Sequence, residues 1–443
     1  MGRSYFIHTF GCQMNESDSQ RMGEALLRAG WAPAGGAEAA DLVLVNTCAI
    51  REKAEDKLFS ALGRYRILKA QRGLKIGVAG CVAQQEKERL LERAPFVDFV
   101  LGPDHLEEVP SLAERGGLRT DFVETEQYLF PRADPETSRG RATAFVTAMK
   151  GCDNVCSFCV VPHTRGREVS RPYAAIVSEI AALVSVGVRE ATLIGQNVNS
   201  YAGGCGFAEL IRRVAEVPGL LRIRFTTSHP MDLSPELVRC FREVPQLMPH
   251  FHLPVQHGAD SVLARMRRKY TIAGYEERIA ALPPGIALTS DVICGFPGET
   301  EEEHQRNLDF LRRTAYDNLF SFLYSPRPHT GAILKQAEWG EVPREVGLRR
   351  LEEVQALQRA RTLARHRARI GGACEVLVED PGFGRSRENW TVHFEGDARI
   401  GDLIEVRIES ASLASLRGSQ TRVLDAAPPA PSARKRSLGV VTA

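Results

Sequence analysis

Three cysteines fall close together in the middle of the chain. Cys152, Cys156 and Cys159 lie in a loop, with a strand-like run before them and a helix-like run after them. Three thiolates at this spacing can hold three irons of a cubane [4Fe-4S] cluster, and the fourth iron is then open to a small molecule. The pattern therefore indicates a site for chemistry on a loop that joins a strand to a helix.

Two other interpretations of these cysteines are open. His163 follows four residues after Cys159, so three cysteines and one histidine could bind zinc. The thiols could also form disulfides. The Cys-x-x-x-Cys-x-x-Cys spacing, with Phe158 before the last cysteine, resembles the signature of radical S-adenosylmethionine (SAM) enzymes. This resemblance favours the iron–sulfur cluster.

The length and composition are those of a globular protein with several domains. A chain of 443 residues, 43% hydrophobic and 25% charged, predicts two to four domains. No apolar run approaches the roughly 18–20 residues that span a bilayer, and no signal peptide precedes the first strand. We therefore expect a cytoplasmic protein that does not enter the membrane, in which the ten cysteines are metal ligands or free thiols. A net charge of +2 means that any surface for nucleic acid must be a local patch.

Three further cysteines each follow a predicted strand near the amino terminus. Strand-like runs at 4–10, 41–46 and 74–79 lead into Cys12, Cys48 and Cys81, with helical periodicity between them. Parallel strands of an open α/β sheet present their carboxyl ends at one edge, so the three thiols should meet there. Cysteine is also a common buried residue, but three in register predict a second cluster, again with one open iron.

The central part of the chain alternates strands and helices. Strand-like runs are expected at 144–149, 191–194, 221–226, 250–253, 286–293 and 319–324. Six such units predict a partial barrel with its reactive groups at the carboxyl ends of the strands. The expected fold class is therefore α/β, with an amino-terminal open parallel domain followed by a partial (β/α)6 barrel.

Taken together, the motifs resemble those of the MiaB family over nearly the whole chain. The residues that carry the resemblance are Gly11-Cys12-Gln13-Met14-Asn15, Asn46-Thr47-Cys48-Ala49-Ile50-Arg51, Gly80-Cys81-Val82-Ala83-Gln84, the Cys152–Cys159 loop with Val161–Glu168, Gly195–Tyr201, Gly295–Thr300 and Tyr324–Pro328. Two places depart from the family pattern: His257 and Asp260 replace serines, and His329 replaces a glycine. These departures leave all six cysteines intact but put local contacts to SAM or substrate in question.

The resemblance implies a tRNA methylthiotransferase that acts on N6-isopentenyl(dimethylallyl)adenosine at position 37 of tRNA. It implies that Cys152, Cys156 and Cys159 hold the [4Fe-4S] cluster that chelates SAM, whose reductive cleavage gives a 5′-deoxyadenosyl radical that removes hydrogen from C2 of the adenine. It implies that Cys12, Cys48 and Cys81 hold an auxiliary [4Fe-4S] cluster that carries the inserted sulfur. A second SAM then donates the methyl group, so two are used per turnover, and the cofactors carry the difficult step.

The family resemblance also sets the expected partners. They are tRNA with isopentenylated adenosine 37 and an electron donor such as flavodoxin or ferredoxin, whereas no sulfur donor is specified. We expect a monomer. Gln196, Asn197 and Asn199 are candidates for contacts to SAM or the base, or for simple loop capping, and Asp291 and Glu299 flank the Gly295 turn; for Glu299 we favour helix capping.

The sequence of the carboxyl-terminal part predicts RNA-binding regions. A helix is expected over 343–369, and its many arginines could form a stripe facing phosphates, although a charge run is usually a solvated face. A second basic group is Arg265, Arg267, Arg268, Lys269 and Tyr270. Strand alternation after Gly371 predicts a small antiparallel β-barrel that resembles the RNA-binding TRAM domain.

We thus expect four segments. They are 1–120 with the auxiliary cluster, 138–369 as the radical SAM core, 370–430 as the TRAM domain and 431–443 as a disordered tail rich in Ala and Pro. Two alternatives to the function remain: the same chemistry on threonylcarbamoyladenosine tRNA or on a ribosomal-protein aspartate, and, more remotely, a non-catalytic zinc protein that binds RNA.

Overall fold

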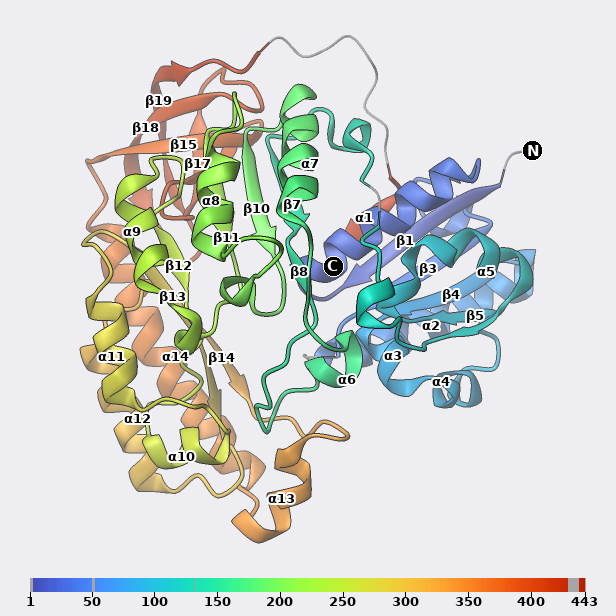
Figure 1. Ribbon diagram of the computed structural model, residues 1–443, viewed down its shortest axis with the longest axis horizontal. Helices are drawn as coiled ribbons and strands as arrows, with labels where there is room; N and C mark the ends of the chain where they lie inside the picture. The colour runs from blue at the N-terminus through green and yellow to red at the C-terminus, as the bar shows by residue number, and fades with distance from the viewer. Residues whose placement is uncertain (1–2, 50–51, 132, 429–437, 443) are drawn as a thin grey trace.

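The amino-terminal part of the protein is a parallel sheet between two layers of helices (Figure 1). The computed structural model describes residues 3–49, 52–131, 133–428 and 438–442. The strands β1 (Ser4–Phe10), β2 (Ala32–Pro33), β3 (Leu42–Thr47), β4 (Lys75–Gly80), β5 (Phe99–Leu101) and β6 (Gly117–Arg119) lie in the order β2-β1-β3-β4-β5-β6, and all these pairings are parallel.

The helices of this part are α1 (Gln13–Arg28), α2 (Glu52–Arg72), α3 (Cys81–Glu86), α4 (Glu88–Arg93) and α5 (Val109–Arg115). Alternate side chains of each strand serve opposite faces of the sheet. Val43 and Val45 of β3 pack in the cluster that includes α2. Leu42 and Leu44 pack in the cluster that includes α1 and α5. Every residue of β3 is buried, as is typical of a central parallel strand, and β3 lies at the strand-like run expected at 41–46.

The central part is the expected partial barrel. Its strands β7 (Thr143–Thr147), β10 (Glu190–Ile194) and β11 (Arg222–Phe225) form one parallel sheet, and β12 (His250–His252), β13 (Ala287–Cys294) and β14 (Asn318–Leu323) form another. A parallel bridge from Ile223 of β11 to Leu247 links the first sheet to the segment that leads into β12. The outer helices are α7 (Tyr173–Ser185), α8 (Phe207–Ala215), α9 (Pro235–Glu243), α10 (Asp260–Arg265), α11 (Ile272–Ala280), α12 (Glu301–Arg313) and α13 (Gly331–Trp339). Figure 1 shows the largest of them along the outside of the strands.

The carboxyl-terminal part is a closed five-stranded barrel. It contains β15 (Ala373–Asp380), β16 (Phe383–Ser386), β17 (Thr391–Glu395), β18 (Leu403–Ala411) and β19 (Leu416–Asp425). Four of its pairings are antiparallel, as expected, but β17 and β19 pair in parallel, so the barrel is mixed. Buried arginines of the core hold it in place: Arg222 donates to the carbonyl of Arg385 at 2.9 Å, and Arg224 donates to that of Ser386 at 2.6 Å.

Three arginines of α14 (Arg344–Arg367) are engaged by other parts of the protein and so do not belong to the predicted phosphate-facing stripe. Arg350 is buried and donates to the carbonyl of Glu299 at 2.8 Å. Arg361 donates to the last carbonyls of α12, and Arg365 pairs with Asp317. These side chains fasten α14 to the barrel, because carboxylates and free helix-end carbonyls face them. Arg367 and Arg369 are exposed.

Residues 438–442 are ordered, although they lie within the tail that was expected to be disordered. β20 (Val440–Thr442) pairs in parallel with Ile7–Thr9 of β1, and Leu438 is 4% exposed. Residues 431–437 and 443 lie outside the described residues. The amino-acid composition of this segment does not predict a strand, because the strand is stabilised by pairing with the edge of β1. No helix among the described residues is long and apolar enough to cross a membrane.

Removing residues 438–443 is expected to expose the edge of β1. The hydrogen bond from the Ile7 amide to the Gly439 carbonyl, 2.9 Å long, would be lost. Amide hydrogen exchange at Ile7–Thr9 should then accelerate, while exchange in β4 stays unchanged. The exposed Val441→Ala variant serves as the control and should exchange like the wild type. Unchanged exchange in β1 after truncation would show that β20 does not protect this edge.

Candidate active site

Cys12, Cys48 and Cys81 meet at one edge of the amino-terminal sheet. They directly follow β1, β3 and β4, which are neighbours in the sheet. Cys48 forms side-chain hydrogen bonds with both Cys12 and Cys81, and Cys48 and Cys81 are 1% and 4% exposed. The three thiols that the sequence placed at strand ends therefore lie together at one edge of the sheet.

Glycines make room for this arrangement. Gly80 has a φ of +92°, and a Cβ there would lie 2.5 Å from the carbonyl oxygen of Thr47. A Cβ on Gly11 would lie 2.7 Å from the Cβ of Cys48. Side chains at these positions would push the strand ends apart, so only glycine lets the cysteine-bearing turns approach one another.

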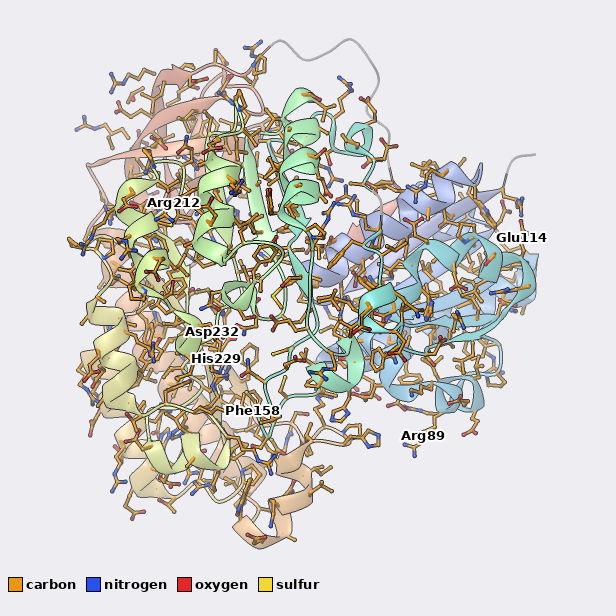
Figure 2. The ribbon with its side chains drawn as sticks, in the orientation of Figure 1. Arg89, Glu114, Phe158, Arg212, His229 and Asp232 are labelled. Carbon is orange, nitrogen blue, oxygen red and sulfur yellow. The ribbon has the colours of Figure 1, made fainter. Side chains whose placement is uncertain are left out.

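Cys152, Cys156 and Cys159 lie in the loop between β8 (Met149–Lys150) and α6 (Val161–Arg165). All three are partly exposed. Figure 2 labels Phe158 in this loop together with His229 and Asp232, which follow β11, and all three are seen toward the lower end of the barrel. The loop thus lies at the carboxyl end of the barrel strands, where the sequence predicted it.

Two neighbours fix the shape of this loop and contact its sulfurs. Gly151 has a φ of +74°, and its amide donates to Oε1 of Gln196 at 2.6 Å. Arg268 donates to Sγ of Cys156 at 3.4 Å and is 8% exposed. Arg268 was predicted to belong to a basic patch for RNA. It is instead buried beside the cysteine loop, and its group neighbour Arg265 pairs with Glu303.

The two sets of thiols differ in their electrostatics. Hydrogen bonds from Cys48 lower the pKa of Cys12 and of Cys81, and the Arg165 guanidinium lowers both further. Burial raises the pKa of Cys159 to about 12. Iron binds the thiolate, so binding at Cys159 must displace a proton. In the amino-terminal set, Cys12 and Cys81 are biased toward the anion, but their hydrogen bonds with Cys48 raise the pKa of Cys48 well above its usual value, so that thiol must also lose a proton.

The donor sets are compatible with cubane clusters. All ten cysteines are free, so no disulfide joins them. His163 is exposed, and its ring lies 5.8 Å from that of His329. Within the part of the chain that the structure describes, no three His, Cys, Asp or Glu side chains are gathered around a point that could hold one metal ion. A cubane takes one thiolate on each iron, so its ligands need not converge on a single point.

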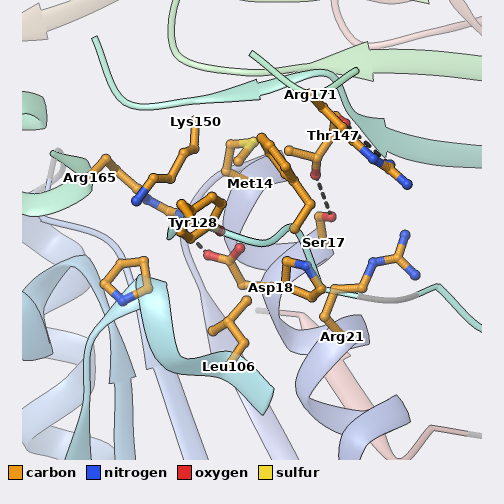
Figure 3. A pocket seen from close by; sticks show the side chains of 13 residues that line it. Met14, Ser17, Asp18, Arg21, Leu106, Tyr128, Thr147, Lys150, Arg165 and Arg171 are labelled. Atoms are coloured by element: carbon orange, nitrogen blue, oxygen red, sulfur yellow. Dashed lines mark hydrogen bonds and ion pairs between the residues drawn. The ribbon is translucent and has the colours of Figure 1, made fainter. Parts of the chain in front are cut away.

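Buried ion pairs hold both ends of the Cys152–Cys159 loop against the amino-terminal part. Lys150, just before the loop, pairs with Asp104 at 2.6 Å, and Arg165, at the end of α6, pairs with Asp18 at 2.6 Å. The Lys150 ammonium also lies 3.7 Å from the ring centre of Tyr128. Figure 3 shows Asp18, Tyr128, Lys150 and Arg165 around one small pocket. The two cysteine sets are therefore held in a fixed relation to each other.

Loss of the Lys150–Asp104 pair is expected to destabilise the protein strongly. Asp104→Asn leaves a lysine with only 7% side-chain exposure without a charged partner, and breaking a buried pair costs about 3–5 kcal/mol. The surface pair Arg212–Glu243, 34% and 51% exposed, supplies the control: Arg212→Gln should change stability by less than about 1 kcal/mol. Urea unfolding of the two variants measures the difference, and equal effects would contradict the assigned role.

A cavity of about 660 Å³ connects the cysteine edge to the other two parts of the molecule. Its walls come from all three: Cys12, Cys48 and Cys81 from the amino-terminal sheet, Gly195, Gln196, Thr226, Thr227, His252 and Phe320 from the barrel, and Arg385, Asn389 and Trp390 from the carboxyl-terminal barrel. Arg369 lies over the Trp390 ring at 4.3 Å. A ligand in this cavity can touch the amino-terminal thiols and the barrel strands together.

The other predicted site residues serve mainly as structural supports. Asn197 donates to Asp232 at 2.8 Å, and Asn199 exchanges hydrogen bonds with the backbone of His229. Glu299 is buried and accepts from the amides of Gly295 and Phe296, so it fastens the turn. Asp291 lines the cavity.

Two departures from the family pattern, His257 and Asp260, have structural explanations, whereas the backbone at His329 favours the glycine that it replaces. His257 is fully buried and its Nε2 lies 3.3 Å from Glu299. Asp260 accepts from the Ile272 amide at 2.7 Å, and His329 is exposed with a φ of +64°.

The contacts of Lys150 and Arg165 were not predicted from the sequence. The only signal that could have pointed to these two residues is their closeness in sequence to the Cys152–Cys159 loop.

Comparisons with known proteins agree with this arrangement. Residues 146–311 match the model of the Radical SAM superfamily, and residues 4–102 match that of Uncharacterized protein family UPF0004. The fold is similar to that of the radical S-adenosylmethionine methyltransferase TsrM from Kitasatospora setae, with a TM-score of 0.56 and 17% identity over 76% of this chain and 78% of that one. Fold and site together define a radical SAM enzyme, which implies a [4Fe-4S] cluster and SAM.

Two relatives place the chain more narrowly. It is 56% identical to the tRNA-2-methylthio-N(6)-dimethylallyladenosine synthase of Myxococcus xanthus (strain DK1622) over 95% of both chains. It is 48% identical to the synthase of the same name from Geobacter metallireducens (strain ATCC 53774 / DSM 7210 / GS-15), over 93% of this chain and 97% of that one. The chain belongs to the tRNA-2-methylthio-N(6)-dimethylallyladenosine synthase family, MiaB, so the predicted family and enzyme class are confirmed and the non-catalytic zinc alternative is set aside.

Proposed function

We propose that this enzyme converts N6-isopentenyl(dimethylallyl)adenosine at position 37 of tRNA into its 2-methylthio derivative. The observation that carries this proposal is the identity of 56% to a synthase of that name over 95% of both chains. The cavity supports it as well, because its volume of about 660 Å³ falls in the range of roughly 300–1,000 Å³ found for sites of single small ligands. A base turned out of the anticodon loop is a ligand of this kind.

The six cysteines would divide into two ligand sets. Cys152, Cys156 and Cys159 would hold the SAM-binding [4Fe-4S] cluster, and Cys12, Cys48 and Cys81 would hold an auxiliary [4Fe-4S] cluster. When bound, the clusters and two molecules of SAM supply hydrogen abstraction from C2 of the adenine, the sulfur atom and the methyl group. The glycine turns at Gly11 and Gly80 support this division, since they let the strand ends that carry the amino-terminal cysteines approach one another closely.

The chain's own residues would position these groups and shield them. Arg268 would stabilise the thiolate of Cys156 by the N–H that it directs at Sγ. Gln196 would hold the start of the cysteine loop through the Gly151 amide. Because the amino-terminal thiols and the barrel strand ends line the same cavity, a base bound there would lie against the auxiliary site.

The remaining parts of the proposal concern organisation and partners. We assign 1–120 to the auxiliary cluster, 138–369 to the radical SAM core and 370–430 to the TRAM domain. A flavodoxin or ferredoxin would supply electrons, and the enzyme would act as a monomer in the cytoplasm. Trp390 and Arg385 in the cavity wall support tRNA binding by the carboxyl-terminal barrel, because aromatic rings and arginines are the usual contacts to unstacked RNA bases.

The substrate is tested by offering the reconstituted enzyme two tRNAs and a ribosomal-protein peptide under reducing, anaerobic conditions. One tRNA carries isopentenyladenosine at position 37 and the other carries threonylcarbamoyladenosine. Mass spectrometry of the digested nucleosides should show the methylthio product only from the first. A product from the threonylcarbamoyl substrate alone, or from a ribosomal-protein peptide, would overturn the proposal in favour of the alternative substrates.

A further inference from the structure

Arg165 spans the distance between the two cysteine sets. It is the last residue of α6, the helix that begins two residues after Cys159. Its side chain leaves the barrel and enters the amino-terminal part, where it is 5% exposed. There its Nε donates to Sγ of Cys81 at 3.2 Å, and its Nη2 donates to Oδ2 of Asp18 at 2.6 Å.

A purely structural role would not require the contact with sulfur. Lys150 and Asp104 already form a buried pair between the same two parts of the molecule, and they pair with each other rather than with a sulfur. The guanidinium of Arg165 differs because its rigid fork directs one N–H at the carboxylate and another at the thiol. Asp18 thereby holds the donor in the orientation that Cys81 requires.

We propose that Arg165 is a positioning residue for the auxiliary cluster, which orients the Cys81 ligand and raises the reduction potential of that cluster. This inference rests on the proposed assignment of Cys12, Cys48 and Cys81. A hydrogen bond to a ligand sulfur and a nearby positive charge both stabilise the more negative, reduced state of an iron–sulfur cluster. Because Arg165 belongs to α6, the same contact fixes the position of the auxiliary site relative to the Cys152–Cys159 loop.

The test uses the full chain with Cys152, Cys156 and Cys159 all changed to alanine, so that only the auxiliary cluster can be present. Three variants are added singly to this background: Arg165→Gln, Arg165→Lys and Asp18→Asn. Two quantities are measured after anaerobic reconstitution. One is the chelator concentration that removes half of the iron, and the other is the midpoint potential from a redox titration followed by electron paramagnetic resonance.

Arg165→Gln should lower the midpoint potential and weaken iron retention by roughly 10- to 100-fold, the range seen when hydrogen-bond partners of metal ligands are removed. Arg165→Lys keeps the charge but lacks the fork, so its effects should be intermediate. Asp18→Asn keeps a side-chain oxygen that can accept from Arg165 but removes the negative charge, so it should shift the potential upward. Opposite shifts for Arg165→Gln and Asp18→Asn distinguish an electrostatic role from general damage to the fold.

The failures of this inference and of the proposed function can be told apart. If the background protein without further changes holds no iron, the assignment of the auxiliary cluster fails. If it holds about four irons and Arg165→Gln and Arg165→Lys leave both measured quantities unchanged, the role of Arg165 fails alone. Folding is checked in a second background with alanine at Cys12, Cys48 and Cys81, in which Arg165→Lys should retain the SAM-binding cluster.

Discussion

Changing Cys12, Cys48 and Cys81 together to alanine is expected to give an enzyme that still cleaves SAM but forms no methylthio product. The three thiols follow β1, β3 and β4 in the amino-terminal sheet, and the Cys152–Cys159 loop belongs to the barrel. Removal of the first set therefore leaves the second set and its surroundings in place. Product formation should fall by more than the roughly 100-fold that loss of a supporting hydrogen bond costs.

This expectation is checked by measuring 5′-deoxyadenosine and methylthiolated nucleoside in the same reaction. Cys205→Ala is the matched control, since Cys205 is half-buried and lies outside the cavity lining. It should form both products at the rate of the wild type. Methylthio product from the triple variant at a rate near that of the wild type would contradict the assignment of these cysteines.

A second large effect is expected for the cysteines of the Cys152–Cys159 loop. Changing Cys152, Cys156 and Cys159 to alanine should abolish both SAM cleavage and product formation, because the site that binds and reduces SAM is lost. The amino-terminal edge should be unaffected, since its cysteines are held by their own strands and by Asn15, which accepts from Cys12 at 3.3 Å. Residual formation of 5′-deoxyadenosine at the wild-type rate would mean that SAM binds elsewhere.

Circular dichroism and urea unfolding of this second variant control for misfolding. All three cysteines are partly exposed in a loop, so their replacement by alanine removes little packing and should change stability by less than about 1 kcal/mol. A loss of activity accompanied by unfolding would not count in favour of the account, whereas a folded and inactive protein does.

The positions of the six cysteines were predictable because they depend on local periodicity. The buried Leu42–Val45 run could form only an interior strand, and the carboxyl ends of parallel strands share one edge whatever the rest of the chain does. The mixed pairing in the carboxyl-terminal barrel was not predictable in this way, since alternation along β19 is the same for a parallel and an antiparallel neighbour.

The roles of the arginines depended on partners far away in the sequence. Arg165 contacts Asp18 and Cys81 across 147 and 84 residues, and no periodicity links such positions. Arg361 was predicted to belong to a basic stripe, but its guanidinium donates a hydrogen bond to a carbonyl at the end of α12. A run of charges in the sequence shows where charged side chains lie along the chain. Burial and nearby opposite charges decide whether each of them contacts solvent, RNA or the protein itself.

The central claim is that one chain holds two separate clusters, each on three cysteines. The most direct measurement is iron and acid-labile sulfide per chain after anaerobic reconstitution, in the wild type and in the variant with alanine at Cys152, Cys156 and Cys159. The account predicts about eight irons falling to about four. About four irons falling to none would contradict it, because Cys12, Cys48 and Cys81 would then bind no cluster.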